Sequence, residues 1–129
     1  MRKPTIGIIG NGFVGEAQAF AFSPVCNIKI YDVDPLKSTH TLNETHDSDF
    51  VFICVPTPMY PDGNQNLEFV KEVFKYANEK PIYILKSTVL PGTTDKLDKN
   101  YSQLKIVFSP EFLTERTSKL DMLTQNRII

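Results

Sequence analysis

The sequence predicts an α/β fold in which a doubly wound, mostly parallel, six-stranded sheet is covered by helices on both faces. Short apolar runs alternate with amphipathic stretches along the 129 residues, as in strands joined by crossover helices. The runs are apolar on both faces, which is typical of strands in a covered parallel sheet. A chain of this length suffices for one core, so we expect one domain over residues 1–129.

The first half of the chain contains two predicted strands and one predicted helix. Residues 5–9 form an apolar run and predict the first strand. Apolar residues then recur at helical spacing until Ser23 and Pro24, which end the helix. Residues 28–31 predict a second strand that ends at Asp32. The polar stretch 34–48 has room for at most one short helical turn.

The second half continues the alternation. Residues 50–55 are the most apolar run of the chain and predict a central strand, which the following prolines end. Asn66 is a candidate N-cap for a helix whose apolar residues recur at Leu67, Val70, Phe74 and Ala77. A short polar helix is expected from about Thr93. The remaining strands are predicted at residues 82–85, 105–108 and 127–129.

The composition argues against several functional classes. The 14 Lys and Arg residues nearly balance the 15 Asp and Glu residues, so we expect neither nucleic acid nor a membrane as partner. Two cysteines are too few for a disulfide framework and lack the spacing of metal ligands. We therefore expect a reduced, cytoplasmic chain without a metal. Polar residues interrupt the apolar amino terminus early, which favours a buried strand over a signal peptide.

The distinctive polar and glycine positions follow the predicted strands directly. In chain order they are the glycine-rich loop 10–15, Asp32, Thr57, Ser87, Thr88 and Glu111. Ligands of doubly wound sheets bind outside the carboxyl ends of the strands. The sequence therefore predicts that these residues share one site.

The loop GNGFVG, residues 10–15, fits the GxGxxG fingerprint of dinucleotide-binding domains. Gly10 permits the tight turn, Gly12 lets the backbone approach a pyrophosphate, and Gly15 lets the helix pack closely on the strand. The helix start, which includes Phe13 and Val14, presents unpaired N–H groups and the positive end of a dipole to the phosphates. This loop predicts a Rossmann-type domain.

Asp32 strengthens the prediction of a dinucleotide site. It follows the second strand at the spacing at which a carboxylate accepts from both ribose hydroxyls, and it would repel a 2′-phosphate. The sequence therefore favours NAD over NADP as the cofactor. Lys37 either steers the adenosine side by its charge or is simply solvated.

The other candidates have two interpretations each. Thr57 lies between two prolines, which would hold its hydroxyl in place or merely end a strand. The hydroxyls of Ser87 and Thr88 could hold a water, touch the nicotinamide or satisfy backbone groups locally. Glu111 and Glu115 could act as bases beside their apolar neighbours, or lie solvated at a helix start. We expect His40 and His46 on the surface and Cys54 as an inert thiol in the core.

Five ordered motifs resemble the UDP-glucose/GDP-mannose dehydrogenases over nearly the whole chain. The motifs are GNGFVG, the strand-end Asp32, CVPTP, KSTVLPGTT and SPEFLTE. The resemblance implies NAD contacts by Val14, Asp32, Lys37, Thr57, Thr88 and Glu115. It also implies a sugar-nucleotide site over Glu111, Phe112, Leu113, Thr114 and Glu115. Glu111 and Glu115 would assist proton transfer or hydrolysis, and Thr88 would help to hold the water.

The resemblance implies a four-electron oxidation at the sugar C6 by two successive hydride transfers to NAD. The family's nucleophile lies in a Cys-Phe-Pro-Lys-Asp pattern, and that pattern does not occur in these 129 residues. The helical linker and the UDP-binding half of the family also have no counterpart here. The segment between Asp32 and the third strand is shorter than is usual, which could remove a wall on the adenine side, and Glu16 follows the glycine loop where the family has an apolar residue.

The leading hypothesis is the NAD-binding half of a nucleotide-sugar 6-dehydrogenase, with UDP-glucose oxidised to UDP-glucuronate. An N-acetylated UDP-sugar and GDP-mannose remain alternative substrates. The abrupt end in an apolar strand favours a truncated chain. We expect this chain to be inactive alone and its missing half to act in cis or in trans. The chain could also form a homodimer. The alternatives are a stand-alone NAD-binding or sensing module, half of a split dehydrogenase and, last, a hydroxyacid dehydrogenase of related fold.

Overall fold

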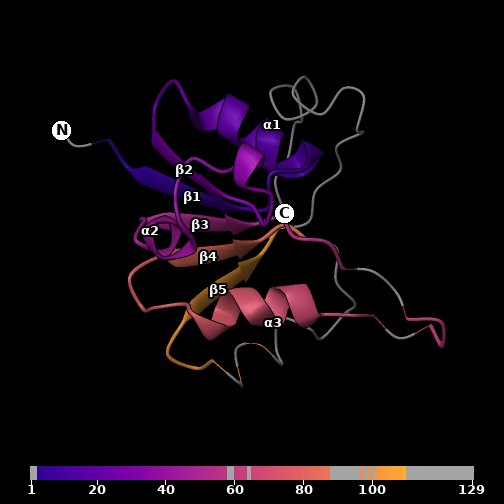
Figure 1. Ribbon diagram of the computed structural model, residues 1–129. Helices are drawn as coiled ribbons and strands as arrows, with labels where there is room; N and C mark the ends of the chain where they lie inside the picture. The colour runs from indigo at the N-terminus through magenta and orange to yellow at the C-terminus, as the bar shows by residue number, and fades with distance from the viewer. Residues whose placement is uncertain are drawn as a thin grey trace.

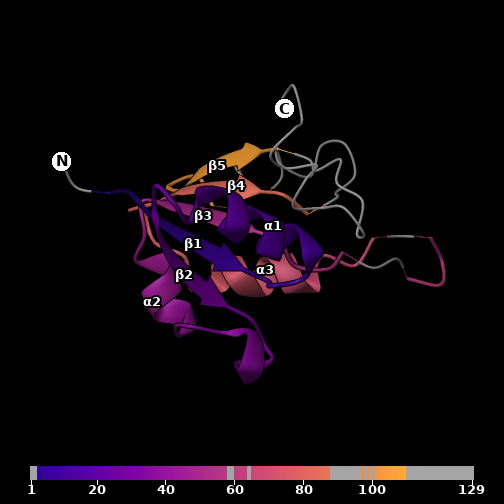
Figure 2. The ribbon, with the colours of Figure 1, turned by 90° about the horizontal axis from the view of Figure 1, so that it is seen from above.

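The computed structural model describes residues 3–57, 60–63, 65–87, 97, 99 and 101–109. Five parallel strands form one sheet in the order β2-β1-β3-β4-β5. The strand arrows in Figure 1 therefore all point the same way, and Figure 2 shows α2 near the β2 edge. The strands are β1 (Thr5–Ile9), β2 (Asn27–Tyr31), β3 (Phe50–Ile53), β4 (Ile82–Leu85) and β5 (Lys105–Phe108). The predicted doubly wound α/β class is confirmed, and the predicted sixth strand lies outside the described residues.

Helices cover both faces of the sheet because the strand residues alternate between two apolar clusters. On one face, the register places Ile30, Ile8, Phe52 and Ile84 in a row beneath α1 (Phe13–Phe22). On the other face, Ile9, Val51 and Ile53 pack with Val70, Val73 and Phe74 of α3 (Glu68–Lys75). This two-sided burial explains why the strands are apolar throughout.

The predicted helices form with small changes in their ends. α1 ends at Phe22 and is followed by Ser23, as predicted. α3 begins one residue later than expected, because Leu67 occupies the N-cap position. The predicted N-cap Asn66 therefore lies one position before the cap, where its Oδ1 accepts the N–H of Glu68 at 2.9 Å. Of the helix expected from about Thr93, only residues 97 and 99 are described, and both have helical backbone.

A loop takes the place of an outer strand beside β2. The described order equals the common dinucleotide-binding order without its outermost strand, because residues 33–49 form only η1 (Pro35–Lys37) and α2 (Leu42–His46). The N–H groups of Thr39 and His40 donate to the Ile30 carbonyl at 2.9 and 3.0 Å. The Thr39 Oγ1 accepts the Ile30 N–H at 3.0 Å. The loop thus satisfies this part of the strand edge, which would otherwise be free to pair with another chain.

The short helix α2 packs directly on β1. A Cβ atom at Gly7 would collide with the Thr45 carbonyl oxygen and lie 3.0 Å from the Ser48 Oγ. Thr41 and Glu44 form a capping box at the start of α2, and the Lys29 Nζ donates to the Glu44 and Asp47 carbonyls at its end. Gly7 therefore sets the close approach that brings α2 onto the sheet.

His46 lies in the core, so its predicted surface position is wrong. It is 1% exposed, and its Nδ1 lies 2.8 Å from the hydroxyl of Tyr83. That hydroxyl also accepts the Asn78 N–H at 3.2 Å. The sequence contains no signal for this burial because His46 lies in a polar stretch, and the close packing of α2 on β1 at Gly7 is a contact between distant segments.

We expect His46 to make the folded state acid-sensitive. Burial lowers the pKa of His46 below 6.5, and a backbone contact with Val73 opposes this only in part. The unfolded chain therefore takes up the proton first, so stability is complete above about pH 6.5 and falls as the pH decreases toward the folded-state pKa. The melting temperature of His46→Gln, measured from pH 7.5 to 5, should fall less steeply than that of the wild type. His40→Gln is the matched control, and an equally flat profile for it would contradict this explanation.

Candidate cofactor site at the carboxyl ends of the strands

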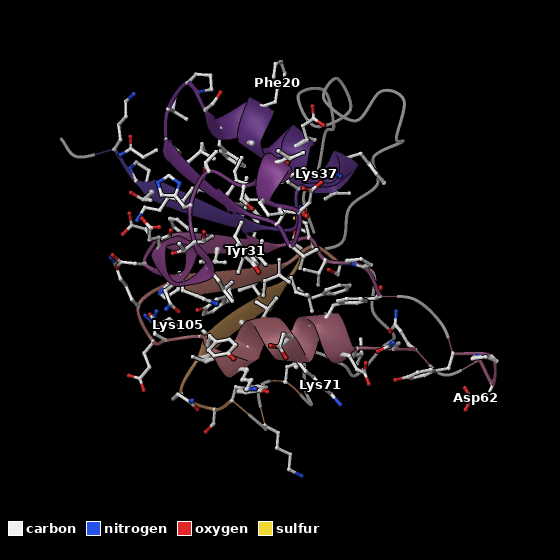
Figure 3. All side chains as sticks on the ribbon, viewed as in Figure 1. Phe20, Tyr31, Lys37, Asp62, Lys71 and Lys105 are labelled. Atoms are coloured by element: carbon white, nitrogen blue, oxygen red, sulfur yellow. The ribbon has the colours of Figure 1, made fainter. Side chains whose placement is uncertain are left out.

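A cavity of about 600 Å³ opens where the carboxyl ends of β1, β2, β3 and β4 meet. Figure 3 shows Lys37 near this end of the sheet. The cavity brings together these predicted residues: Gly10, Gly12, Phe13, Val14, Asp32, Lys37, Thr57 and Ser87. The predicted residues Thr88, Glu111, Phe112, Leu113, Thr114 and Glu115 lie outside the described residues.

The three glycines of the loop lie in three different steric environments. Gly10 has a φ of 96°, and a Cβ there would lie 2.6 Å from the Cys54 carbonyl oxygen. A Cβ at Gly15 would collide with the Gly10 carbonyl oxygen, so α1 lies tight against the loop. A Cβ at Gly12 would meet nothing within 4 Å. Gly12 lines the cavity, and its missing side chain leaves room for a ligand next to the backbone.

The carboxylate of Asp32 is held by backbone groups on two sides. The N–H of Asn11, within the glycine loop, donates to Oδ2 at 2.8 Å. The N–H of Asp34 donates to Oδ1 at 2.9 Å. A carboxylate offers about four acceptor positions, so both oxygens can still accept hydrogen bonds from a ligand. The carboxylate is thus fixed beside the glycine loop and ready to accept from a pair of hydroxyls.

Asn11 joins the glycine loop to the loop after β2. Its Nδ2 donates to the Lys37 carbonyl at 3.0 Å, in addition to the backbone bond to Asp32. Ser38 closes the second loop, since its Oγ accepts the Asp32 N–H and donates to the Asp32 carbonyl, both at 2.8 Å. The two loops therefore form one connected rim, and the spacing of the glycines gave no indication of this role for Asn11.

An apolar hollow of about 300 Å³ adjoins the cavity on the α3 face. Gly10, Asp32, Val33, Val55 and Pro56 line both spaces. The walls of the hollow are completed by Ile9, Tyr31, Leu42, Phe69, Glu72 and Val73. The shortened segment after Asp32 therefore still leaves a largely apolar recess next to the carboxylate, with a volume that suffices for a weakly polar ring.

At the ends of β3 and β4, Cys54 differs from expectation, Ser87 takes one of its expected roles and Lys86 is an additional residue of the cavity. Cys54 was predicted inside a core strand, but β3 ends at Ile53 and the half-buried Cys54 lines the cavity. The Ser87 hydroxyl donates to the Val55 carbonyl at 2.7 Å, which is the local backbone role that the sequence had left open. Lys86 also lines the cavity, and the sequence gives no signal for this position.

The donors and spaces of the cavity fit a dinucleotide. The start of α1 offers N–H groups for a pyrophosphate, Asp32 offers acceptors for ribose hydroxyls, and the apolar hollow lies beside it. Within the described part of the chain, no three His, Cys, Asp or Glu side chains cluster to hold a metal ion. Among the same residues, no helix is long and apolar enough to cross a membrane.

Comparison with known proteins agrees with this geometry. Residues 31–129 match the model of the UDP-glucose/GDP-mannose dehydrogenase family, NAD binding domain. The chain is 33% identical over 105 residues to a UDP-glucose 6-dehydrogenase of Campylobacter jejuni. This match covers 78% of this chain and 27% of that protein. The chain thus spans about a quarter of this relative.

Two solved structures share the fold. A UDP-glucose dehydrogenase from Pyrobaculum islandicum superposes with a TM-score of 0.81 at 22% identity, over 98% of this chain and 40% of that one. A ternary complex of GDP-mannose dehydrogenase from Pseudomonas aeruginosa gives 0.75 at 24% identity, over 90% and 38%. Together with the match of the family model, the glycine loop and the strand-end carboxylate lead to one conclusion: the chain belongs to the UDP-glucose/GDP-mannose dehydrogenase family and carries its NAD-binding domain.

Proposed function

We propose that this domain serves a nucleotide-sugar 6-dehydrogenase, in which UDP-glucose is oxidised to UDP-glucuronate by two successive hydride transfers to NAD. The observation that carries the proposal is the Asp32 carboxylate, which the Asn11 N–H fixes at 2.8 Å beside the glycine loop. An acceptor at this place selects a cofactor with a free ribose 2′-hydroxyl over one with a 2′-phosphate. Bound NAD would accept the hydride from the sugar carbon.

The residues of this chain would bind the cofactor across the carboxyl ends of four strands. Asp32, at the end of β2, would hold the adenosine ribose, and the start of α1 would hold the pyrophosphate through backbone N–H groups. Val33, Leu42 and Phe69 would enclose the adenine in the apolar hollow. Lys37 and Thr57 would contact the cofactor from the cavity wall.

The chemistry on the sugar would need residues beyond this cavity. We assign proton transfer and the hydrolytic water to Thr88, Glu111 and Glu115, and the sugar-nucleotide contacts to residues 111–115, from the resemblance of their motifs. The Cys-Phe-Pro-Lys-Asp pattern of the family's nucleophile does not occur in these 129 residues. We therefore propose that a nucleophile and a UDP-binding part are supplied by a further segment or by a partner chain.

Turnover of the purified 129-residue chain tests this division of labour. Calorimetry should show that the chain binds NAD. When the chain is incubated with NAD and UDP-glucose, mass spectrometry should detect no UDP-glucuronate. Turnover should appear when a polypeptide that carries the family's nucleophile and UDP-binding half is added. UDP-glucuronate formed by the chain alone would contradict the proposal. NAD binding with no turnover in any combination would favour a stand-alone binding module instead.

A further inference from the structure

Lys86 is a buried cation at the end of β4, in the wall of the cavity. Its side chain is 4% exposed, and its Nζ donates to the Ser109 Oγ, which follows β5, at 3.2 Å. The backbone fixes both residues, since the Lys86 N–H donates to the Ile53 carbonyl at 2.9 Å and the Ser109 N–H to the Leu85 carbonyl at 3.1 Å. Lysine is among the residues least often buried, so an ammonium held at a ligand cavity calls for an explanation.

The order of the strands places Lys86 opposite the adenosine end of the cavity. Asp32 follows β2, the glycine loop follows β1, Thr57 lies after β3, and Lys86 follows β4. From β2 to β4 there are three strand spacings, roughly 14 Å. A dinucleotide with its adenosine ribose on Asp32 and its pyrophosphate on α1 therefore extends its nicotinamide toward β3 and β4. Lys86 and Lys37, both in the wall of the cavity, lie toward opposite ends of such a ligand.

The two redox forms of the cofactor differ in charge at this end. The oxidised nicotinamide ring carries one positive charge, and the reduced ring is neutral. A nearby ammonium raises the free energy of the oxidised ring and leaves that of the reduced ring almost unchanged. Resting on the proposed placement of NAD, we propose that Lys86 sets a preference of this site for NADH over NAD⁺. Such a preference makes the reduced cofactor the more tightly held species after hydride transfer.

Substitution of Lys86 isolates this effect. Lys86→Met removes one positive charge whatever else the side chain contacts, so the affinity for NAD⁺ should rise relative to that for NADH. The dissociation constant for NAD⁺ is measured by calorimetry and that for NADH by fluorescence. The constant for NAD⁺ divided by the constant for NADH should fall on the order of fivefold. Lys86→Arg keeps the charge and should keep the ratio. Ser109→Ala removes the hydroxyl partner without removing charge, so it should also keep the ratio.

Lys37→Met is the matched control, because it removes a lysine from the wall of the same cavity at the adenosine side. It should change both affinities by the same factor. An unchanged ratio in folded Lys86→Met or Lys86→Gln, with folding checked by thermal melting, would overturn the inference. So would a wild-type chain that binds NAD⁺ more tightly than NADH, a measurement that needs no variant. A wild-type chain that binds neither form would contradict the proposed function itself, and the inference with it.

Discussion

Replacing Asp32 with alanine should weaken NAD binding about thirtyfold. The carboxylate is held by the N–H groups of Asn11 and Asp34 at 2.8 and 2.9 Å, and it would accept from the hydroxyls of the adenosine ribose. Hydrogen bonds to a charged group contribute about 2 kcal/mol, which is about thirtyfold in affinity. Calorimetric titration of wild type and variant measures the change. The affinity of the variant for NADP should fall less than its affinity for NAD, or rise, because the variant no longer repels a 2′-phosphate.

Asp34→Ala is the control for the Asp32 variant. The Asp34 carboxylate lies in the same loop and accepts the Leu36 N–H at 3.0 Å, at the start of η1, and it does not line the 600 Å³ cavity. This variant should bind NAD within about twofold of the wild type, since it leaves the ribose acceptor in place. If Asp32→Ala binds NAD as tightly as the wild type and melts at the same temperature, the ribose is not held by this carboxylate.

Replacing Gly15 with alanine should reduce NAD binding by at least a hundredfold and also destabilise the fold. The new Cβ would collide with the Gly10 carbonyl oxygen, so the start of α1 must move away from the loop. Overpacking of this kind costs about 2 kcal/mol in the free energy of unfolding, and displacement of α1 removes the pyrophosphate donors from their positions. Urea unfolding and NAD titration of the same sample measure the two effects.

Gly12→Ala separates the two effects of the Gly15 variant. A Cβ at Gly12 meets no atom within 4 Å and points into open space at the cavity. Its free energy of unfolding should fall by less than about 1 kcal/mol, the scale of an N-cap change, yet its NAD affinity should still drop at least tenfold. Equal NAD affinities for Gly12→Ala and the wild type would mean that the pyrophosphate does not approach the loop here.

The strands and the cofactor loop could be predicted because their signals are local. Residues 50–55 are apolar throughout since both faces of β3 are covered, and the glycines span the junction from the end of β1 to the first turn of α1. Asp32 was identified for the same reason, as the first residue after β2. In each case the neighbours along the chain determine the environment of the residue.

The features that the sequence missed depend on contacts between distant segments. His46 is buried because Gly7, 39 positions away in the printed sequence, lets α2 approach β1. Lys86 lies buried beside Ser109, on the neighbouring strand end, whose hydroxyl accepts from its ammonium. The edge of β2 is covered by Thr39 and His40 through backbone bonds to Ile30 that no side-chain pattern encodes. Propensity and spacing describe neighbours along the chain, so they contain none of these contacts.

In the proposed complex, NAD lies across the carboxyl ends of β1 to β4 with its adenosine ribose on Asp32. Titration of the ¹⁵N-labelled chain with NAD, followed by two-dimensional NMR, tests it most directly. We expect saturable shifts of the amides of Gly12, Val14, Asp32 and Ser87, and small shifts at the amino ends of the strands, at Asn27, Phe50 and Ile82. Absence of saturable shifts, or shifts concentrated at those amino ends, would contradict it.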